Sequence, residues 1–169
     1  MSEIHLLLKN RKSCRRFLEK AVSIQDIYTI LEAARWAPSG KNGQPWRFVI
    51  VKEKETKNKI ASCSIYKDWM IDADTFIVIY LDKGSSYNYK KDLQAIGAAI
   101  ENICLQASSM NIDTCWIGEI LEKEIEVNKI INVPETYELM AVICIGYANE
   151  NMVRTDRMEL SRLIYKEIY

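Results

Sequence analysis

Apolar and polar positions along the chain follow two alternating patterns, and the first of them is helical. After Ser23, apolar residues recur every three or four positions as far as Ala34, which predicts an amphipathic helix that Ser23 caps and Pro38 ends. The same spacing between Leu93 and Met110 predicts a longer helix. Short helices are expected over residues 2–10, 54–63 and 122–131, and a helix or tail over residues 157–169.

The second pattern consists of apolar runs rich in β-branched residues, which predict strands. These runs cover residues 46–52, 75–82, 113–118 and 138–148. The second and fourth runs are apolar at almost every position, which is typical of strands buried on both faces. Strands therefore alternate with helices around a central sheet. No repeat or low-complexity tract interrupts the pattern, so we expect a single domain over residues 1–169.

The balance of charge argues against nucleic acid or a membrane surface as a partner. The chain carries 23 Lys and Arg against 23 Asp and Glu, so its formal net charge is zero. No apolar run approaches membrane-spanning length, and the N-terminal run is too short for a signal peptide. Five cysteines without CxxC spacing and one histidine, His5, argue against a metal site and for buried thiols. We expect a cytoplasmic protein.

Two polar segments are candidates for chemistry, and "NRKSCRRF" is the first. It brings four cations and one hydroxyl into six residues: Arg11, Lys12, Ser13, Arg15 and Arg16. Arginine can form two parallel hydrogen bonds to a phosphate, and serine can add a third. The alternative is a solvated basic loop between two helices, which is the more common role of such a charge run.

The second candidate is "ARWAPSGKNGQPWRFVIV", in which a polar turn separates the end of a helix from a strand. The alternative here is an ordinary turn that ends the helix. Signatures of other activities are absent, because the chain contains no GxGxxG after the first strand, no GxxxxGK[ST], no HExxH and no GxSxG. With His5 as the single histidine, hydrolysis by a Ser-His or Cys-His pair is disfavoured.

Taken together, the two segments resemble the nitroreductase family of flavin mononucleotide (FMN) enzymes. The resemblance rests on an Arg-x-Ser-x-Arg segment, a helix, and the motif A-P-S-x-x-N-x-Q-P-W-R-F that leads into a strand. It continues at "AIGAAIENICLQASSMNIDTCWIG" and at "VICIGYANENMVRTDRMEL", in the family's order. The resemblance implies an α+β fold, a three-layer α/β/α sandwich with a mixed central sheet, and an intertwined homodimer with FMN at its interface.

The resemblance also implies roles for individual residues. Arg11, Ser13 and Arg15 would hold the FMN phosphate with help from Lys12, and the C-terminal loop would add Arg154 and Arg157. The other subunit would line the flavin ring with Pro38, Ser39, Gly40 and Asn42, while Gln44 would bond nearby backbone or the ring. A backbone amide at Ile117 and Gly118 would face the N5/O4 edge of the ring. Trp46 is expected to anchor the turn in the core.

The implied activity needs no catalytic side chain, because the flavin performs the chemistry. NADH or NADPH would deliver hydride to flavin N5, and a nitroaromatic, quinone or related acceptor would then take the electrons in a ping-pong cycle. Two alternatives remain open: a non-catalytic FMN-binding or storage protein, and a specialised flavin-dependent reductase of another acceptor. Asp74 departs from the family pattern, which has proline before the second strand. The C-terminal tail is expected to cross onto the partner subunit.

Overall fold

The helices begin where short polar side chains cap them. The computed structural model describes residues 1–149 and 155–169. In α1 (Glu3–Asn10), the Ser2 hydroxyl accepts the His5 N–H at 3.3 Å. In α2 (Ile24–Arg35), the Ser23 hydroxyl accepts the Asp26 N–H at 3.0 Å, as the capping-box pattern predicted. The remaining helices are α3 (Lys54–Ala61), α4 (Lys67–Met70), α5 (Tyr89–Ser109), α6 (Glu124–Ile131) and α7 (Leu160–Leu163), with 3₁₀ turns η1 (Gly40–Asn42) and η2 (Glu119–Lys123).

Four strands form one sheet in the order β1-β2-β4-β3, and every neighbouring pair is antiparallel. The strands are β1 (Trp46–Val51), β2 (Thr75–Asp82), β3 (Asp113–Ile117) and β4 (Tyr137–Gly146). The expected mixed sheet is therefore wrong for these strands. β2 and β3 do run in the same direction, as a strand–helix–strand crossover through α5 requires, but β4 lies between them and runs opposite to both. Their parallel direction thus produces no parallel pairing.

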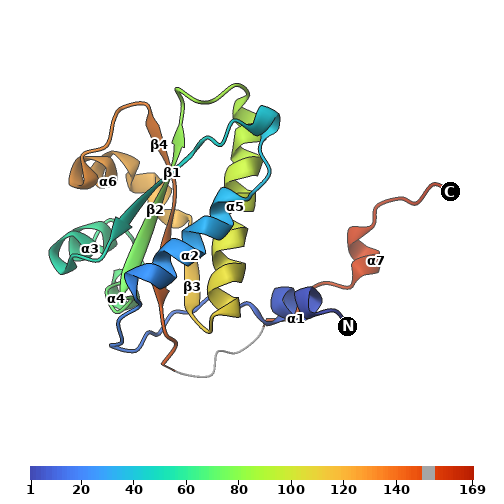
Figure 1. The fold of residues 1–169 in the computed structure, drawn as a ribbon, viewed down its shortest axis with the longest axis horizontal. Coiled ribbons are helices and arrows are strands. Elements are labelled where there is room, and N and C mark those ends of the chain that lie inside the picture. Colours follow the sequence, from blue (N-terminus) through green and yellow to red (C-terminus); the bar gives the residue numbers. More distant parts are fainter. Residues whose placement is uncertain (150–154) are drawn as a thin grey trace.

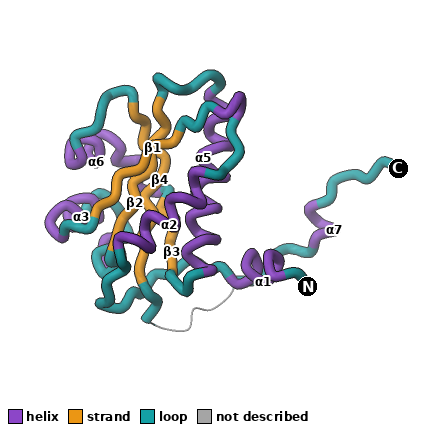
Figure 2. Tube along the Cα trace, viewed as in Figure 1, coloured by secondary structure: helices purple, strands orange, loops and turns teal. Residues whose placement is uncertain are grey.

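Helices cover both faces of the sheet, which gives the three layers that the sequence predicted (Figures 1 and 2). On one face, Ile77 and Ile79 of β2 belong to a cluster with buried residues of α2 and α5. On the other, Phe76 and Val78 pack in a second cluster with residues of α3 and α6. Because neighbouring residues of a strand point to opposite faces, β2 is buried almost from end to end.

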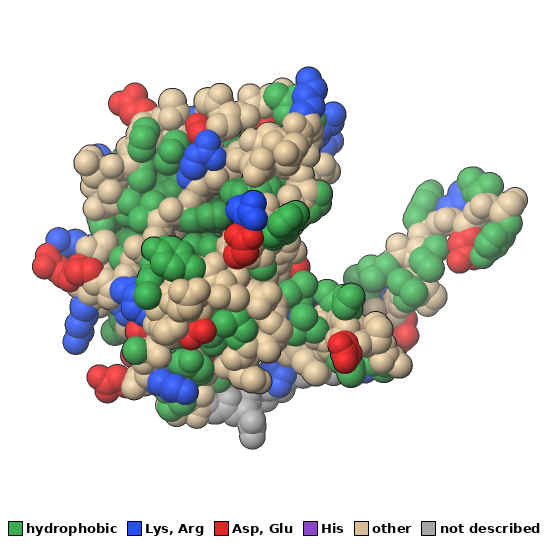
Figure 3. All heavy atoms as spheres, viewed as in Figure 1, with side chains coloured by type: hydrophobic (Ala, Val, Ile, Leu, Met, Phe, Trp, Pro, Cys, Tyr) green, Lys and Arg blue, Asp and Glu red, His purple; other side chains and the backbone are tan. Residues whose placement is uncertain are grey.

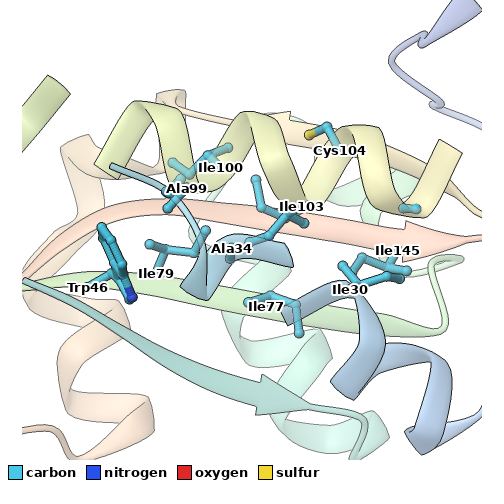
Figure 4. Packing of buried hydrophobic residues seen from close by; sticks show 14 of the residues in the cluster. Ile30, Ala34, Trp46, Ile77, Ile79, Ala99, Ile100, Ile103, Cys104 and Ile145 are labelled. Atoms are coloured by element: carbon cyan, nitrogen blue, oxygen red, sulfur yellow. The ribbon is translucent and has the colours of Figure 1, made fainter. Parts of the chain in front are cut away.

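Trp46 is 6% exposed and anchors the turn before β1 in the first of these clusters, as expected. Figure 4 shows its ring beside Ile79, with Ala99, Ile100 and Ile103 of α5 across the layer and Ala34 of α2 among them. The position of this turn is thus fixed by burial of a large aromatic side chain.

Helix α5 begins four residues earlier than the apolar pattern indicated. Asn88 caps it by accepting the Lys91 N–H at 3.1 Å, so Tyr89, Lys90 and Lys91 belong to the helix and not to the preceding loop. Leu93, which the spacing placed on the buried face, is 37% exposed. None of the described helices is long and apolar enough to cross a membrane.

The two ends of the chain leave apolar side chains exposed. Helix α1 contains no buried residue, and the segment from Thr155 onward extends away from the sheet as an arm (Figure 1). Hydrophobic side chains lie along this arm and on α1 (Figure 3). They include Ile4, Leu6, Leu8, Met158, Leu160, Leu163 and Ile168.

Candidate functional site

The basic segment after α1 is fixed beside strand β3. Ser13 forms a parallel bridge with Thr114, and the Cys14 N–H donates to the Thr114 carbonyl oxygen at 2.8 Å. Cys14 and Phe17 are buried in the core, so Ser13 and Arg15 are held at the sheet margin on either side of an anchored residue. This backbone pairing gives the segment a defined position that a solvated basic loop would lack.

A cavity of about 560 Å³ lies between this segment, α1 and the start of the C-terminal arm. Of the six residues predicted to hold the phosphate, five line the cavity: Arg11, Lys12, Ser13, Arg15 and Arg157. The sixth, Arg154, lies outside the described residues. None of the described lining residues is acidic. The cavity is therefore suited to an anion.

Arg11 has a competing partner at the margin of this cavity. Its Nε lies 3.7 Å from Oε1 of Glu101 on α5. Sequence reasoning missed this ion pair, and it also missed His5, Leu8, Lys9 and Thr155 in the lining. The first three lie one turn apart on α1, directly before the basic segment, and this spacing is the signal that could have indicated them.

Ile117 and Gly118 lie at the other end of β3 from the bridge to Ser13. Ile117 is buried, whereas a Cβ added to Gly118 would meet nothing within 4 Å. Gly118 has an ordinary φ of −95°, so its backbone conformation does not require glycine. The Glu119 carboxylate next to it accepts the Ser64 hydroxyl at 2.6 Å, which ties this strand end to the loop between α3 and α4. Gly118 thus borders open space at a fixed strand end.

The segment from Pro38 to Gln44 forms a tight turn with an unusual backbone. Lys41, Asn42 and Gln44 have φ values of 54°, 56° and 46°, in the left-handed region that non-glycine residues rarely adopt. The Ser39 hydroxyl accepts the Gln44 N–H at 3.1 Å. Gln44 Nε2 donates to the Asn42 carbonyl oxygen at 3.2 Å. The turn therefore carries strain that these contacts hold in place.

Tyr87, from the loop between β2 and α5, packs directly on this turn. A Cβ built on Gly40 would lie 2.6 Å from Cε1 of Tyr87, so a larger residue at this position would require the Tyr87 ring to shift. Arg47 Nη2 adds a second link between the turn and this loop, because it donates to Oδ2 of Asp82 at 2.6 Å and to the Ser85 hydroxyl at 2.9 Å.

Within one chain the turn and the basic cavity lie at opposite ends of the fold. The turn contacts Tyr87, which lies just before α5. The cavity residue Arg11 contacts Glu101, which lies twelve residues into that helix, about 18 Å along its axis. The sheet gives a larger separation: Asp82 pairs with Tyr137 at the turn end, and Thr114 pairs with Ile145, about 27 Å further along β4. One chain does not bring the two predicted halves of the site together.

The cysteines beside the cavity are poorly suited to redox chemistry. Cys14 is fully buried and Cys115 is 2% exposed. Burial raises the pKa of the Cys115 thiol to about 11, which disfavours the reactive thiolate. In the described part of the chain, no group of three or more His, Cys, Asp or Glu is placed to hold a metal ion.

Asp74, which departs from the expected proline, is a structural centre. One of its carboxylate oxygens, Oδ2, accepts the Val22 N–H at 3.1 Å and the Thr75 hydroxyl at 2.7 Å, and it also accepts a hydrogen bond from Lys52 Nζ. Burial raises the pKa of Asp74, but the hydrogen bonds outweigh it and hold the pKa below its usual value.

The protein therefore combines an α+β fold with a cavity whose described lining is cationic. The chain belongs to the nitroreductase family, whose family model matches residues 8–65 and 61–147. The resemblance inferred from the motifs is thereby confirmed.

Individual relatives agree with this family assignment. The chain is 31% identical over 153 residues to an Archaeoglobus fulgidus protein provisionally named NADH dehydrogenase/NAD(P)H nitroreductase, with 89% of this chain and 88% of that protein covered. It is 28% identical to an oxygen-insensitive NADPH nitroreductase of Helicobacter acinonychis, over 73% of this chain and 81% of the relative. The structure also matches a provisionally named Desulfovibrio desulfuricans nitroreductase in complex with FMN, with a TM-score of 0.93, 30% identity, and 100% and 99% of the two chains covered.

Proposed function

We propose that this protein is an FMN-dependent oxidoreductase that uses NADH or NADPH to reduce nitroaromatics, quinones or related small acceptors. The observation that carries the proposal is the cavity in which Arg11, Ser13, Arg15 and Arg157 converge from opposite ends of the chain. Such a donor set suits a phosphate monoester, because guanidinium groups and a hydroxyl satisfy its charge and its oxygen lone pairs. The residues present therefore fit the phosphate end of FMN.

The ring end of the ligand is assigned to the same strand. From the bridge at Thr114, β3 leads to Gly118, about 14 Å along the chain, so the cavity and the open strand end can serve one elongated ligand. The amides at Ile117 and Gly118 would donate to the ring edge, where fixed donors favour the charge that reduction brings. The absence of a Cβ at Gly118 leaves space for the ring.

FMN, when bound, supplies the two-electron chemistry of hydride acceptance and donation. The protein's part is to bind, orient and limit solvent access. We assign no catalytic acid or base to a side chain. Ser39, Asn42 and the adjoining Pro38 and Gly40 would cover the ring from a second copy of the chain, since within one chain this turn lies about 27 Å from the cavity along the sheet, about twice the distance from the cavity to Gly118.

The second copy is also supported by the apolar side chains on α1 and on the C-terminal arm, which find no cover within the described chain. On α5, a Cβ added to Gly97 would meet nothing within 4 Å, so this helix can accept a close neighbour. We therefore propose a homodimer in which each flavin contacts both chains and in which the arm crosses onto the partner.

The decisive experiment is the visible spectrum of the purified protein, recorded without oxygen before and after addition of NADH or NADPH. We expect flavin absorbance that is bleached by at least one nicotinamide and restored by an acceptor such as a quinone. Bound flavin that neither nicotinamide bleaches would favour the storage alternative. A colourless protein that FMN cannot reconstitute would contradict the proposal.

A further inference from the structure

The strained turn presents one side chain that its conformation does not explain. Lys41 adopts a φ of 54°, where glycine or asparagine would be less strained, yet the position holds a lysine. Its Nζ lies 4.9 Å from the centroid of the Tyr87 ring. The backbone at this position would favour glycine or asparagine, so we attribute the presence of Lys41 to its side chain.

Tyr87 carries a second cation. Lys91, in the first turn of α5, places its Nζ 5.5 Å from the same ring centroid. Tyr87 remains 40% exposed, so the ring lies at the surface with two ammonium groups beside it. Gly40 beneath the ring keeps Tyr87 against the turn. Lys41, Tyr87 and Lys91, which we call the lysine–tyrosine cluster, therefore form a fixed group and not three independent surface residues.

No carboxylate of the described residues forms an ion pair with Lys41 or Lys91. Asp82 is paired with Arg47 at 2.6 Å. Asp92 is 1% exposed and accepts the Ser86 hydroxyl at 2.6 Å and the Asn88 N–H at 3.2 Å. Glu138 accepts the Tyr89 hydroxyl at 2.7 Å. These three carboxylates are held by other donors, and neither Lys41 nor Lys91 is paired with one of them.

We propose that the lysine–tyrosine cluster binds the phosphate groups of the nicotinamide dinucleotide and favours NADPH over NADH. This inference rests on the proposed function, in which the Pro38–Gln44 turn borders the flavin ring of the partner. A nicotinamide that lies on the ring extends its phosphates past that turn. The ammonium groups of Lys41 and Lys91 can form charge-assisted hydrogen bonds to the phosphates, above all to the additional 2′-phosphate of NADPH. The exposed ring of Tyr87 can stack on the adenine.

The test replaces the charges singly and together in the FMN-loaded protein, with Lys41→Gln, Lys91→Gln and the double variant. Lys90→Gln is the matched control, since it removes the same charge from the same helical turn but points about 100° away from Lys91. We measure KM and kcat for NADPH and NADH, and the Kd of oxidised NADP⁺ by calorimetry. The NADP⁺ measurement reports binding without turnover.

We expect the KM for NADPH and the Kd of NADP⁺ to rise about threefold in each single variant and about tenfold in the double variant, as for exposed charge pairs. The kcat and the FMN content should remain within twofold of the unaltered protein. The KM for NADH should rise less than the KM for NADPH. Lys41→Arg, which keeps the positive charge, should bind NADPH as the unaltered protein does.

Two results would overturn the inference while leaving the proposed function intact. One is flavin reduction by NADPH with a KM and an NADP⁺ Kd that change no more in the double variant than in Lys90→Gln. The other is an equal rise in KM for NADH and NADPH. If neither NADH nor NADPH reduces the flavin of the unaltered protein, the proposed function is refuted, and this inference with it.

Discussion

Replacing Arg15 by alanine tests the proposed phosphate site most directly. Arg15 lines the basic cavity, and its neighbours Cys14 and Phe17 are buried, so the backbone of the segment should hold its place in the variant. Coulomb attraction between unit charges 4 Å apart is about 1 kcal/mol in bulk water and about 4 kcal/mol near a protein surface. A cavity open to solvent lies between these limits, so we expect a loss of about 2 kcal/mol, or about 30-fold in the Kd of FMN.

The assay is fluorescence titration of flavin-stripped protein with FMN, accompanied by circular dichroism to show that the variant is folded. Arg16→Ala is the matched control, because it removes the same charge one residue away and Arg16 does not line the cavity. Glu101→Gln should act in the opposite direction, since it releases Arg11 from its ion pair. We expect FMN to bind about threefold more tightly to that variant, as for a partly exposed pair.

The reasoning fails if Arg15→Ala binds FMN within twofold of the unaltered protein, or if Arg16→Ala weakens binding equally. A salt titration gives an independent check. Because the proposed interaction is electrostatic, the difference between Arg15→Ala and the unaltered protein should shrink as ionic strength rises.

Three further predictions concern the structural support of the site. Asp74→Asn should lower the free energy of unfolding by about 2 kcal/mol at pH 7, because Lys52 and a buried N–H lose a carboxylate partner. Because the folded pKa of Asp74 lies below its usual value, the stability that its carboxylate contributes is present above pH 3.8 and is lost as the pH falls through the folded pKa. The urea midpoints of the variant and the unaltered protein should therefore converge at acidic pH. Midpoints that keep a constant difference down to pH 2 would contradict the role of the carboxylate. Gly40→Ala should displace the Tyr87 ring and lower stability by about 1 kcal/mol, and an unshifted urea midpoint would refute this packing. Truncation after Leu160 should reduce both the dimer fraction in sedimentation and the FMN content, and an unchanged dimer with full FMN would exclude a role for the arm.

Local features of the fold could be predicted from the sequence because local interactions determine them. The hydroxyls of Ser2 and Ser23 cap their helices by accepting hydrogen bonds from amides three residues later, and apolar runs alone identify all four strands. The antiparallel sheet could not be predicted in this way. It depends on the insertion of β4 between β2 and β3, which is a pairing between distant segments and leaves no local signal.

The candidate site shows the same division. The motifs indicated Arg11, Ser13 and Arg15, and the fold places them in one cavity with Arg157. The helical spacing of His5 and Lys9 indicates that they share one face of α1, but which cavity that face borders depends on how α1 packs. The contact between Lys41 and Tyr87 joins residues 46 positions apart, and nothing in the spacing of either residue predicts it.

Two observations of different kinds have one explanation in the proposed dimer. Within one chain, the predicted ring-binding turn lies about 27 Å from the phosphate cavity along the sheet, about twice the distance from that cavity to Gly118. Large apolar side chains on α1 and on the arm remain exposed, at a cost that a soluble chain normally avoids by covering them. Because α1 and the arm also supply the walls of the cavity, a partner that covers their apolar side chains would fix those walls at the same time as its own turn closes over the ring. Dimer formation and completion of the flavin site would then be a single event, and a change that weakens one should weaken the other.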